Sequence, residues 1–117
     1  MFKIAILQKR AINAQIDKNI ESIIAVMKEA LENHADILLL PECFITGYDL
    51  PMSYEKSIED NDIRIAKICE NAKKYKIGVV LTAFTKGNKQ PHNSAFVINK
   101  SGDIYLVFHK YHHNLQA

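Results

Sequence analysis

One glutamate stands in a setting that suits acid–base chemistry. Glu42 follows a run of apolar residues typical of a buried strand, in the segment Leu40-Pro41-Glu42-Cys43-Phe44-Ile45-Thr46-Gly47-Tyr48. A side chain at the carboxyl end of a buried parallel strand lies where open α/β sheets place their sites. Partly apolar surroundings raise the pKa of a carboxyl group, which favours proton transfer near neutral pH. Glu42 is therefore a candidate general base, and a surface glutamate in a loop is the alternative.

A lysine and several histidines lie near the end of the sequence. Lys110 follows an apolar, strand-like stretch at 103–109 and precedes Tyr111-His112-His113. A lysine fixed at a strand end can stabilise a developing oxyanion, whereas a solvated lysine is the commoner case. His92, His109, His112 and His113 have no acidic or cysteine residue close by in the sequence. We therefore expect a solvated histidine cluster, with no metal site and no cofactor.

Neither cysteine of the chain is placed as a nucleophile. Cys43 adjoins Glu42, and because neighbouring residues of a strand point to opposite faces, we expect its thiol to point away from the site. Cys69 belongs to the apolar stripe of a predicted helix, where a buried and inert thiol is expected. The two cysteines have neither metal-like spacing nor a secretory context to pair them, which indicates a reduced, cytoplasmic protein.

The hydrophobic pattern predicts an α/β fold with the element order β-α-β-α-β-β-β. Apolar residues recur at helical spacing from Ile20, with Asp17 or Asn19 as the cap, and again in a second segment. Gly102 suits a turn with positive φ between the last two strands. The predicted strands are 3–8, 35–40, 77–85, 93–99 and 103–109, the predicted helices are 20–32 and 61–75, and the segments 42–58 and 86–91 are predicted loops.

The sheet predicted from this pattern has one face without a cover. Residues 37–40 and 79–81 are apolar on both alternating faces, so both faces of the sheet should be buried. Right-handed crossovers would place both helices on the same face if the strand order does not reverse. A second layer is therefore expected from a further part of the chain or from a partner, and the exposed face predicts a homo-oligomer.

Composition excludes several classes of protein. The 117 residues fit one domain, 1–117, with 48% hydrophobic and 24% charged residues. A net charge of +2 and dispersed lysines do not favour nucleic acid, and the longest apolar run is far below the ~20 residues of a membrane span. Gln8-Lys9-Arg10 follow the first strand, so the chain lacks the acidic residues of a phosphate receiver and the glycines of a dinucleotide fold.

In order and spacing, several segments together resemble the amino-terminal portion of the nitrilase superfamily of carbon–nitrogen hydrolases. These segments are Lys3–Gln8, Ala35–Tyr48, Asn93-Ser94-Ala95, Gly102 and Lys110-Tyr111-His112. The match is closest in Leu-Pro-Glu with the following Gly47-Tyr48, whereas the lysine segment departs from the family pattern at Phe108 and His113. The resemblance implies that the chain is an incomplete half of a four-layer α-β-β-α sandwich, a truncated carbon–nitrogen hydrolase domain.

The resemblance also implies roles for two residues. Glu42 matches the family's general base, and Lys110 matches the lysine that stabilises the tetrahedral intermediate. The family's nucleophilic cysteine has no match here, so we expect a hydrolase of amides or nitriles by family but an inactive chain by itself. A non-catalytic remnant that pairs with another chain is the alternative. If the site assignment is right, the side-chain ends of Glu42 and Lys110 lie within about 10 Å of each other.

Overall fold

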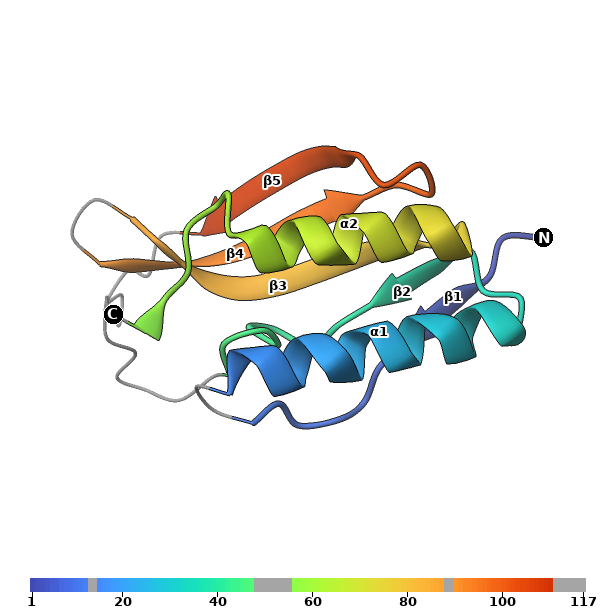
Figure 1. Ribbon diagram of the computed structural model, residues 1–117, viewed down its shortest axis with the longest axis horizontal. Helices are drawn as coiled ribbons and strands as arrows, with labels where there is room; N and C mark the ends of the chain where they lie inside the picture. The colour runs from blue at the N-terminus through green and yellow to red at the C-terminus, as the bar shows by residue number, and fades with distance from the viewer. Residues whose placement is uncertain (13–14, 48–55, 88–89, 111–117) are drawn as a thin grey trace.

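The observed elements follow the predicted order (Figure 1). The computed structural model describes residues 1–12, 15–47, 56–87 and 90–110. The elements are β1 (Ile4–Ile6), α1 (Ile16–Glu32), β2 (Ile37–Leu39), α2 (Ile63–Tyr75), β3 (Gly78–Lys86), β4 (Pro91–Ile98) and β5 (Ile104–Lys110).

Within these described residues the strands form one five-stranded sheet in the order β1-β2-β3-β4-β5. β1, β2 and β3 are parallel, and β4 and β5 continue the sheet in antiparallel pairing. The β3–β4 ladder is longer than predicted, because Lys86 pairs with Pro91. Proline is tolerated as the first residue of a strand, where its missing N–H removes little from the ladder. The loop predicted at 86–91 is therefore shorter.

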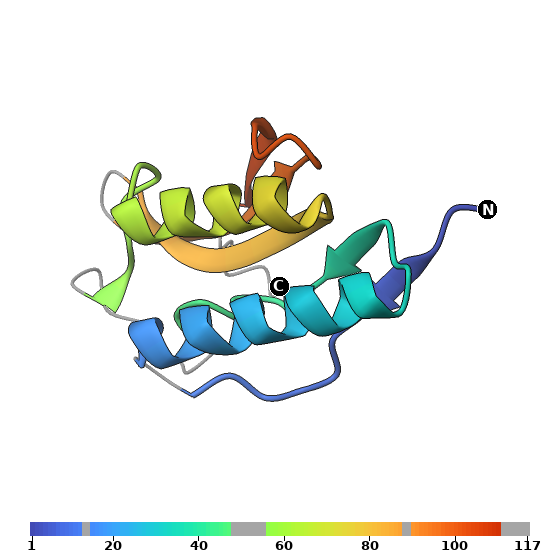
Figure 2. The same ribbon diagram turned by 45° about the vertical axis from the view of Figure 1, so that its right-hand side comes forward.

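Both helices cover the same face of the sheet. Figure 1 shows α1 and α2 side by side in front of the strands, and the turned view of Figure 2 keeps them on that side. The two helices also pack against each other. Between helices and sheet lies the core, whose fully buried members include Ile20, Ile23, Met27, Leu38, Ile65, Ile68, Val79, Leu81, Phe96 and Ile98. The expectation of two crossovers on one face is confirmed, since the strand order does not reverse.

The opposite face of the sheet is apolar and open. One row of paired residues crosses all five strands on this face: Ile6, Leu39, Val80, Val97 and Leu106. Ile6 is 65% exposed, and the middle members of the row are only half-buried. Their neighbours Leu38 and Val79, on the helix side, are at most 1% exposed. This contrast shows that, within the described residues, only one face of the sheet is covered.

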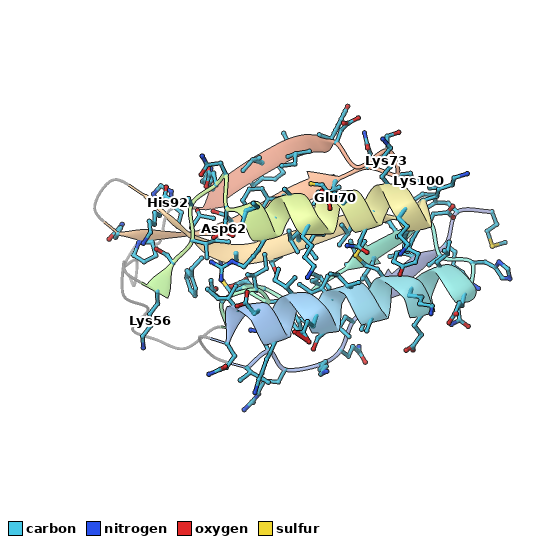
Figure 3. All side chains as sticks on the ribbon, viewed as in Figure 1. Lys56, Asp62, Glu70, Lys73, His92 and Lys100 are labelled. Atoms are coloured by element: carbon cyan, nitrogen blue, oxygen red, sulfur yellow. The ribbon has the colours of Figure 1, made fainter. Side chains whose placement is uncertain are left out.

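The β4–β5 turn packs closely on α2. Gly102 has a φ of 83°, as predicted for this turn. A Cβ atom at Gly102 would lie 2.5 Å from the carbonyl oxygen of Cys69, so the close approach also requires glycine. Figure 3 shows Lys100, in this turn, at the same end of the molecule as Lys73 of α2. Lys100 adds an ion pair with Asp36, at 3.0 Å.

The predicted cap of the first helix is wrong. The helix begins at Ile16, and its N-cap residue Gln15 makes no side-chain capping hydrogen bond. Asn19 lies inside the helix and is 2% exposed. Its Oδ1 accepts a hydrogen bond from the Ile12 N–H, and its Nδ2 donates to the carbonyl oxygens of Ile12 and Ile45. Asn19 therefore joins the segment before α1 to the turn that follows β2.

No helix in the described part of the chain has the length and apolar character that crossing a bilayer requires.

Replacing Asn19 with alanine should destabilise the fold. Asn19→Ala leaves the buried Ile45 carbonyl and the Ile12 N–H without their partner, which costs about 1–3 kcal/mol of unfolding free energy. Urea unfolding at low protein concentration measures this loss. Asn71→Ala is the matched control, because the side chain of Asn71 only donates to the Lys67 carbonyl on the surface of α2. Equal stabilities for the two variants would contradict the tethering role of Asn19.

Candidate active site

The turn that carries Glu42 is fixed to β3 by hydroxyl groups. The Thr82 hydroxyl donates a hydrogen bond to the Pro41 carbonyl and accepts one from the Phe44 N–H. The Ile45 N–H donates to the Thr82 carbonyl at 2.9 Å. Further along, Thr46 Oγ1 accepts from the Phe84 N–H. Both threonines are buried, so these bonds are shielded from water and hold residues 41–46 against the strand.

A hollow of about 330 Å³ lies beside this turn. Its lining comes from β3, β4, β5 and the residues that follow β2, namely Leu40, Glu42, Thr82, Asn93, Ser94, Ala95 and Phe108. The side chain of Glu42 is exposed, in place of the partly apolar burial expected from the sequence. Its carboxylate is therefore accessible to a small molecule that enters the hollow.

Cys43 does not itself line this hollow, but its thiol contacts Asn93, which does. The prediction assumed strand alternation, but residues 42–46 form a turn and Cys43 has a φ of 55°. Its Sγ donates a hydrogen bond to Asn93 Oδ1 at 3.4 Å. The thiol is completely buried, and this burial, with the nearby Glu42 charge, raises the pKa of Cys43 to about 12. Because the thiolate is the nucleophilic form, Cys43 remains an unsuitable nucleophile.

Cys69 is half-buried on α2, and burial raises the pKa of its thiol above the usual range. It is therefore less enclosed than the apolar stripe predicts, yet no better as a nucleophile.

The backbone of Lys110 lies across from Asn93, at the end of the β4–β5 ladder. Asn93 also lines the hollow beside Glu42. The side chain of Lys110 lies outside the described residues, as do Tyr48, Tyr111, His112 and His113. The separation of the Glu42 and Lys110 side chains therefore stays a prediction.

His109 has partners that its sequence neighbourhood does not reveal. Its Nδ1 lies 2.7 Å from Ser94 Oγ, and its Nε2 lies 2.9 Å from Asp60 Oδ2. Ser94 in turn shares a 2.7 Å hydrogen bond with Thr85. The expectation of a histidine without an acidic partner is wrong for His109, because Asp60 is distant in sequence and close in space.

This chain of hydrogen bonds fixes the end of β5 rather than forming a serine nucleophile. Ser94 is 2% exposed, so no substrate reaches its hydroxyl. His92 lies near, with its ring 5.6 Å from that of His109.

Among the described residues, no group of three or more histidine, cysteine, aspartate or glutamate side chains is arranged to hold a metal ion.

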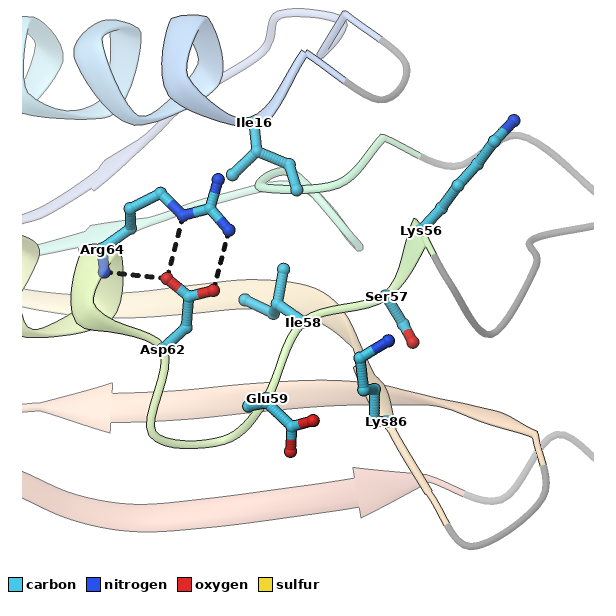
Figure 4. Close-up of a pocket in the computed structure, with 8 residues that line it drawn as sticks. All are labelled: Ile16, Lys56, Ser57, Ile58, Glu59, Asp62, Arg64 and Lys86. Carbon is cyan, nitrogen blue, oxygen red and sulfur yellow. Dashed lines mark hydrogen bonds and ion pairs between the residues drawn. The ribbon is translucent and has the colours of Figure 1, made fainter.

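A second hollow, of about 280 Å³, lies near the start of α2 (Figure 4). Two of its charged residues, Asp62 and Arg64, already pair with each other. Arg64 donates two hydrogen bonds to the carboxylate of Asp62 and reaches Asp17 at 3.4 Å. The side-chain hydrogen bond from Arg64 lowers the pKa of Asp62 below its usual range. Ser57 and Lys86 also have interaction partners. We therefore interpret this hollow as part of the packing around the start of α2 and not as a binding site.

Removing the Thr82 hydroxyl should loosen the Glu42 turn. Thr82→Val keeps the shape of the side chain but leaves the Pro41 carbonyl and the Phe44 N–H unpaired, which costs about 1–3 kcal/mol. Hydrogen exchange at the Phe44 amide should become faster in Thr82→Val and change little in Thr82→Ser. An unchanged Phe44 exchange rate in Thr82→Val would contradict this account.

Known proteins show the same combination of sequence and fold. The family model of the carbon-nitrogen hydrolases matches residues 3–116. A protein described as hydrolase in agr operon, from Staphylococcus aureus, is 30% identical over 111 residues, which cover 94% of this chain and 42% of the relative. The 2-oxoglutaramate amidase of Bacillus subtilis is 32% identical over 85 residues, covering 72% of this chain and 33% of the relative.

Solved structures share the fold. A cysteine-to-alanine variant of the amidase from Nesterenkonia sp. AN1, in complex with butyramide, superposes with a TM-score of 0.77 at 23% identity. The match covers 93% of this chain and 42% of that one. The chain thus spans about two fifths, or less, of the relatives it matches. Since the family model covers nearly all of its residues, this chain belongs to the carbon–nitrogen hydrolase family, as the resemblance to nitrilases indicated.

Proposed function

We propose that this chain supplies the general base and the oxyanion-stabilising lysine of an enzyme that hydrolyses small amides or nitriles. Glu42 is the base and Lys110 is the lysine. The observation that carries the proposal is the hollow beside Glu42, whose lining includes Asn93, the backbone partner of Lys110. The Glu42 carboxylate faces solvent there on a turn that buried hydrogen bonds hold in place.

The reaction needs a cysteine nucleophile from outside residues 1–117. Glu42 accepts the thiol proton as sulfur attacks the substrate carbon, and Lys110 stabilises the oxyanion of an amide substrate. Glu42 then returns that proton to the leaving nitrogen, and ammonia or an amine departs from a thioester. Water attacks the thioester while Glu42 accepts its proton, and the carboxylic acid and the protonated cysteine are released.

The names of the relatives support this substrate class. They include the 2-oxoglutaramate amidase of Bacillus subtilis and an aliphatic nitrilase of Rhodococcus rhodochrous. Both act on a carbon–nitrogen bond by their names, and no cofactor enters the steps above. The free thiols of Cys43 and Cys69 fit a cytoplasmic setting.

A second candidate function rests on the open face of the sheet. Phe108 is 60% exposed and Leu106 is 44% exposed on a face that also holds Leu39, Val80 and Val97. A contiguous apolar surface of this kind favours burial against a second sheet. That sheet would come from the remainder of a longer enzyme or from another copy of this chain, which would make a homo-oligomer. In the second case the chain would act by pairing, without catalysis.

A chimera tests the catalytic proposal. Residues 1–110 are joined to the part of the Nesterenkonia amidase that contains its active-site cysteine, and ammonia release from butyramide is measured. Glu42→Gln should lower turnover by about a hundredfold to ten-thousandfold, since the base is lost. Glu70→Gln, on α2 away from the hollow, is the control.

The 117-residue chain alone should release no ammonia, because the nucleophile is absent. Ammonia release by the purified chain that Glu42→Gln abolishes would contradict the need for an outside cysteine. Undiminished turnover by the Glu42→Gln chimera would contradict the role of Glu42.

The open face should make the isolated chain associate. Light scattering across a dilution series should show a mass that rises with concentration. Leu106→Glu places a charge on the open face and should shift the chain towards monomer and reduce binding of a hydrophobic dye. Ile63→Glu is the control, because Ile63 is 82% exposed on the helix layer. A monodisperse monomer that binds no dye would mean that the face is covered in solution.

A further inference from the structure

Asn93 is placed between the two groups that the proposed reaction uses. It lines the hollow beside Glu42, and its backbone pairs with that of Lys110. The residue is half-buried, so its side chain is neither packed away in the core nor free in solvent. Nothing in the reaction described above assigns a role to its carboxamide.

Only one end of this carboxamide is engaged. Asn93 Oδ1 accepts the hydrogen bond from the Cys43 thiol at 3.4 Å. The Nδ2 group, which carries two N–H donors, has no hydrogen-bond partner within residues 1–12, 15–47, 56–87 and 90–110. No buried side-chain nitrogen or oxygen lacks a partner in that part of the chain, so Nδ2 is not fully buried, and Asn93 is one of the residues that line the hollow.

The thiol fixes which end of the carboxamide is presented. Cys43 is completely buried, in a turn that Thr82 holds against β3. Burial raises the pKa of this thiol, so sulfur keeps its proton in neutral solution and remains a donor. A half-turn of the carboxamide would give up the S–H···Oδ1 hydrogen bond and leave Nδ2 against sulfur, which is only a weak acceptor. Oδ1 is therefore held at the sulfur, and Nδ2 is presented elsewhere.

We propose that Asn93 is a substrate-binding residue of the Glu42 site, whose Nδ2 group donates a hydrogen bond to the carbonyl oxygen of a small, uncharged amide. This inference rests on the proposed function, since it assigns the ligand of the same site. An uncharged acceptor is favoured over a carboxylate, because the Glu42 carboxylate lines the same hollow and repels a second negative charge.

Binding of butyramide to the ¹⁵N-labelled 117-residue chain tests the inference by NMR. The side-chain NH₂ signals of Asn93 and the backbone amides of Ala95 and Phe108 should move in a saturable way. The side-chain signals of Asn71 should not, because its Nδ2 already donates to the Lys67 carbonyl at 2.8 Å. This measurement needs no catalytic turnover and hence no nucleophile.

Asn93→Asp replaces the donor with an acceptor of the same shape and should weaken butyramide binding by about tenfold or more. Asn71→Asp is the matched control and should bind as the parent chain does. Asn93→Ser is a second variant, and the backbone spectrum reports whether each variant is folded. In addition, peptide mapping after iodoacetamide treatment should show faster labelling of Cys43 in Asn93→Ser. The shorter serine side chain no longer covers the thiol or accepts its hydrogen bond.

The outcomes separate the two proposals. Weaker binding in Asn93→Asp and Asn93→Ser, with Asn71→Asp unchanged, supports the inference. Undiminished binding in both Asn93 variants, with Ala95 and Phe108 still shifting, overturns the inference and leaves the Glu42 site intact. No shift around the hollow at any butyramide concentration overturns both the inference and the amide site on which it rests.

Discussion

The handedness of two crossovers determines most of this structure. β1, α1, β2, α2 and β3 form two parallel units in which the strand order never reverses. Right-handed connections then bring both helices to one face. One consequence is a core packed between helices and sheet on that side. The other is that the opposite face, although equally apolar, receives no layer from the described residues.

The same topology determines where chemistry is possible. β2 ends at Leu39, and the following residues stay against β3, with Ile45 beside Thr82, Thr46 beside Phe84 and Ile58 beside Thr85. Because β3 and β4 extend beyond the end of β2, their side chains form a wall beside the turn. Glu42 lines the same hollow as Thr82 of β3 and Asn93 of β4. A rigid strand thus supports a turn that carries the exposed carboxylate, which is the usual division between scaffold and site.

The sequence is sufficient for the order of elements and insufficient for contacts between distant segments. Helical spacing and apolar runs locate every strand and helix, and Gly102 marks a turn that has positive φ. Asn19 was misjudged because capping is a local rule, whereas its bonds reach Ile45. The strand alternation assumed for Cys43 does not apply, because this residue lies in a turn. The helix α2 and the strands β3 and β4 lie between Asp60 and His109 in the sequence, and local spacing contains no signal for their contact.

The position of β5 at the edge of the sheet has a consequence of its own. Within the described residues, no strand pairs with its outer side, so alternate backbone N–H and C=O groups there lack a ladder partner. Such an edge is a template for strand addition, which needs backbone complementarity rather than matching side chains. An added strand would lengthen the sheet in its own plane, whereas a partner on the open face would stack above it. The two modes differ in symmetry as well, because antiparallel pairing of two β5 edges about a two-fold axis closes after two copies.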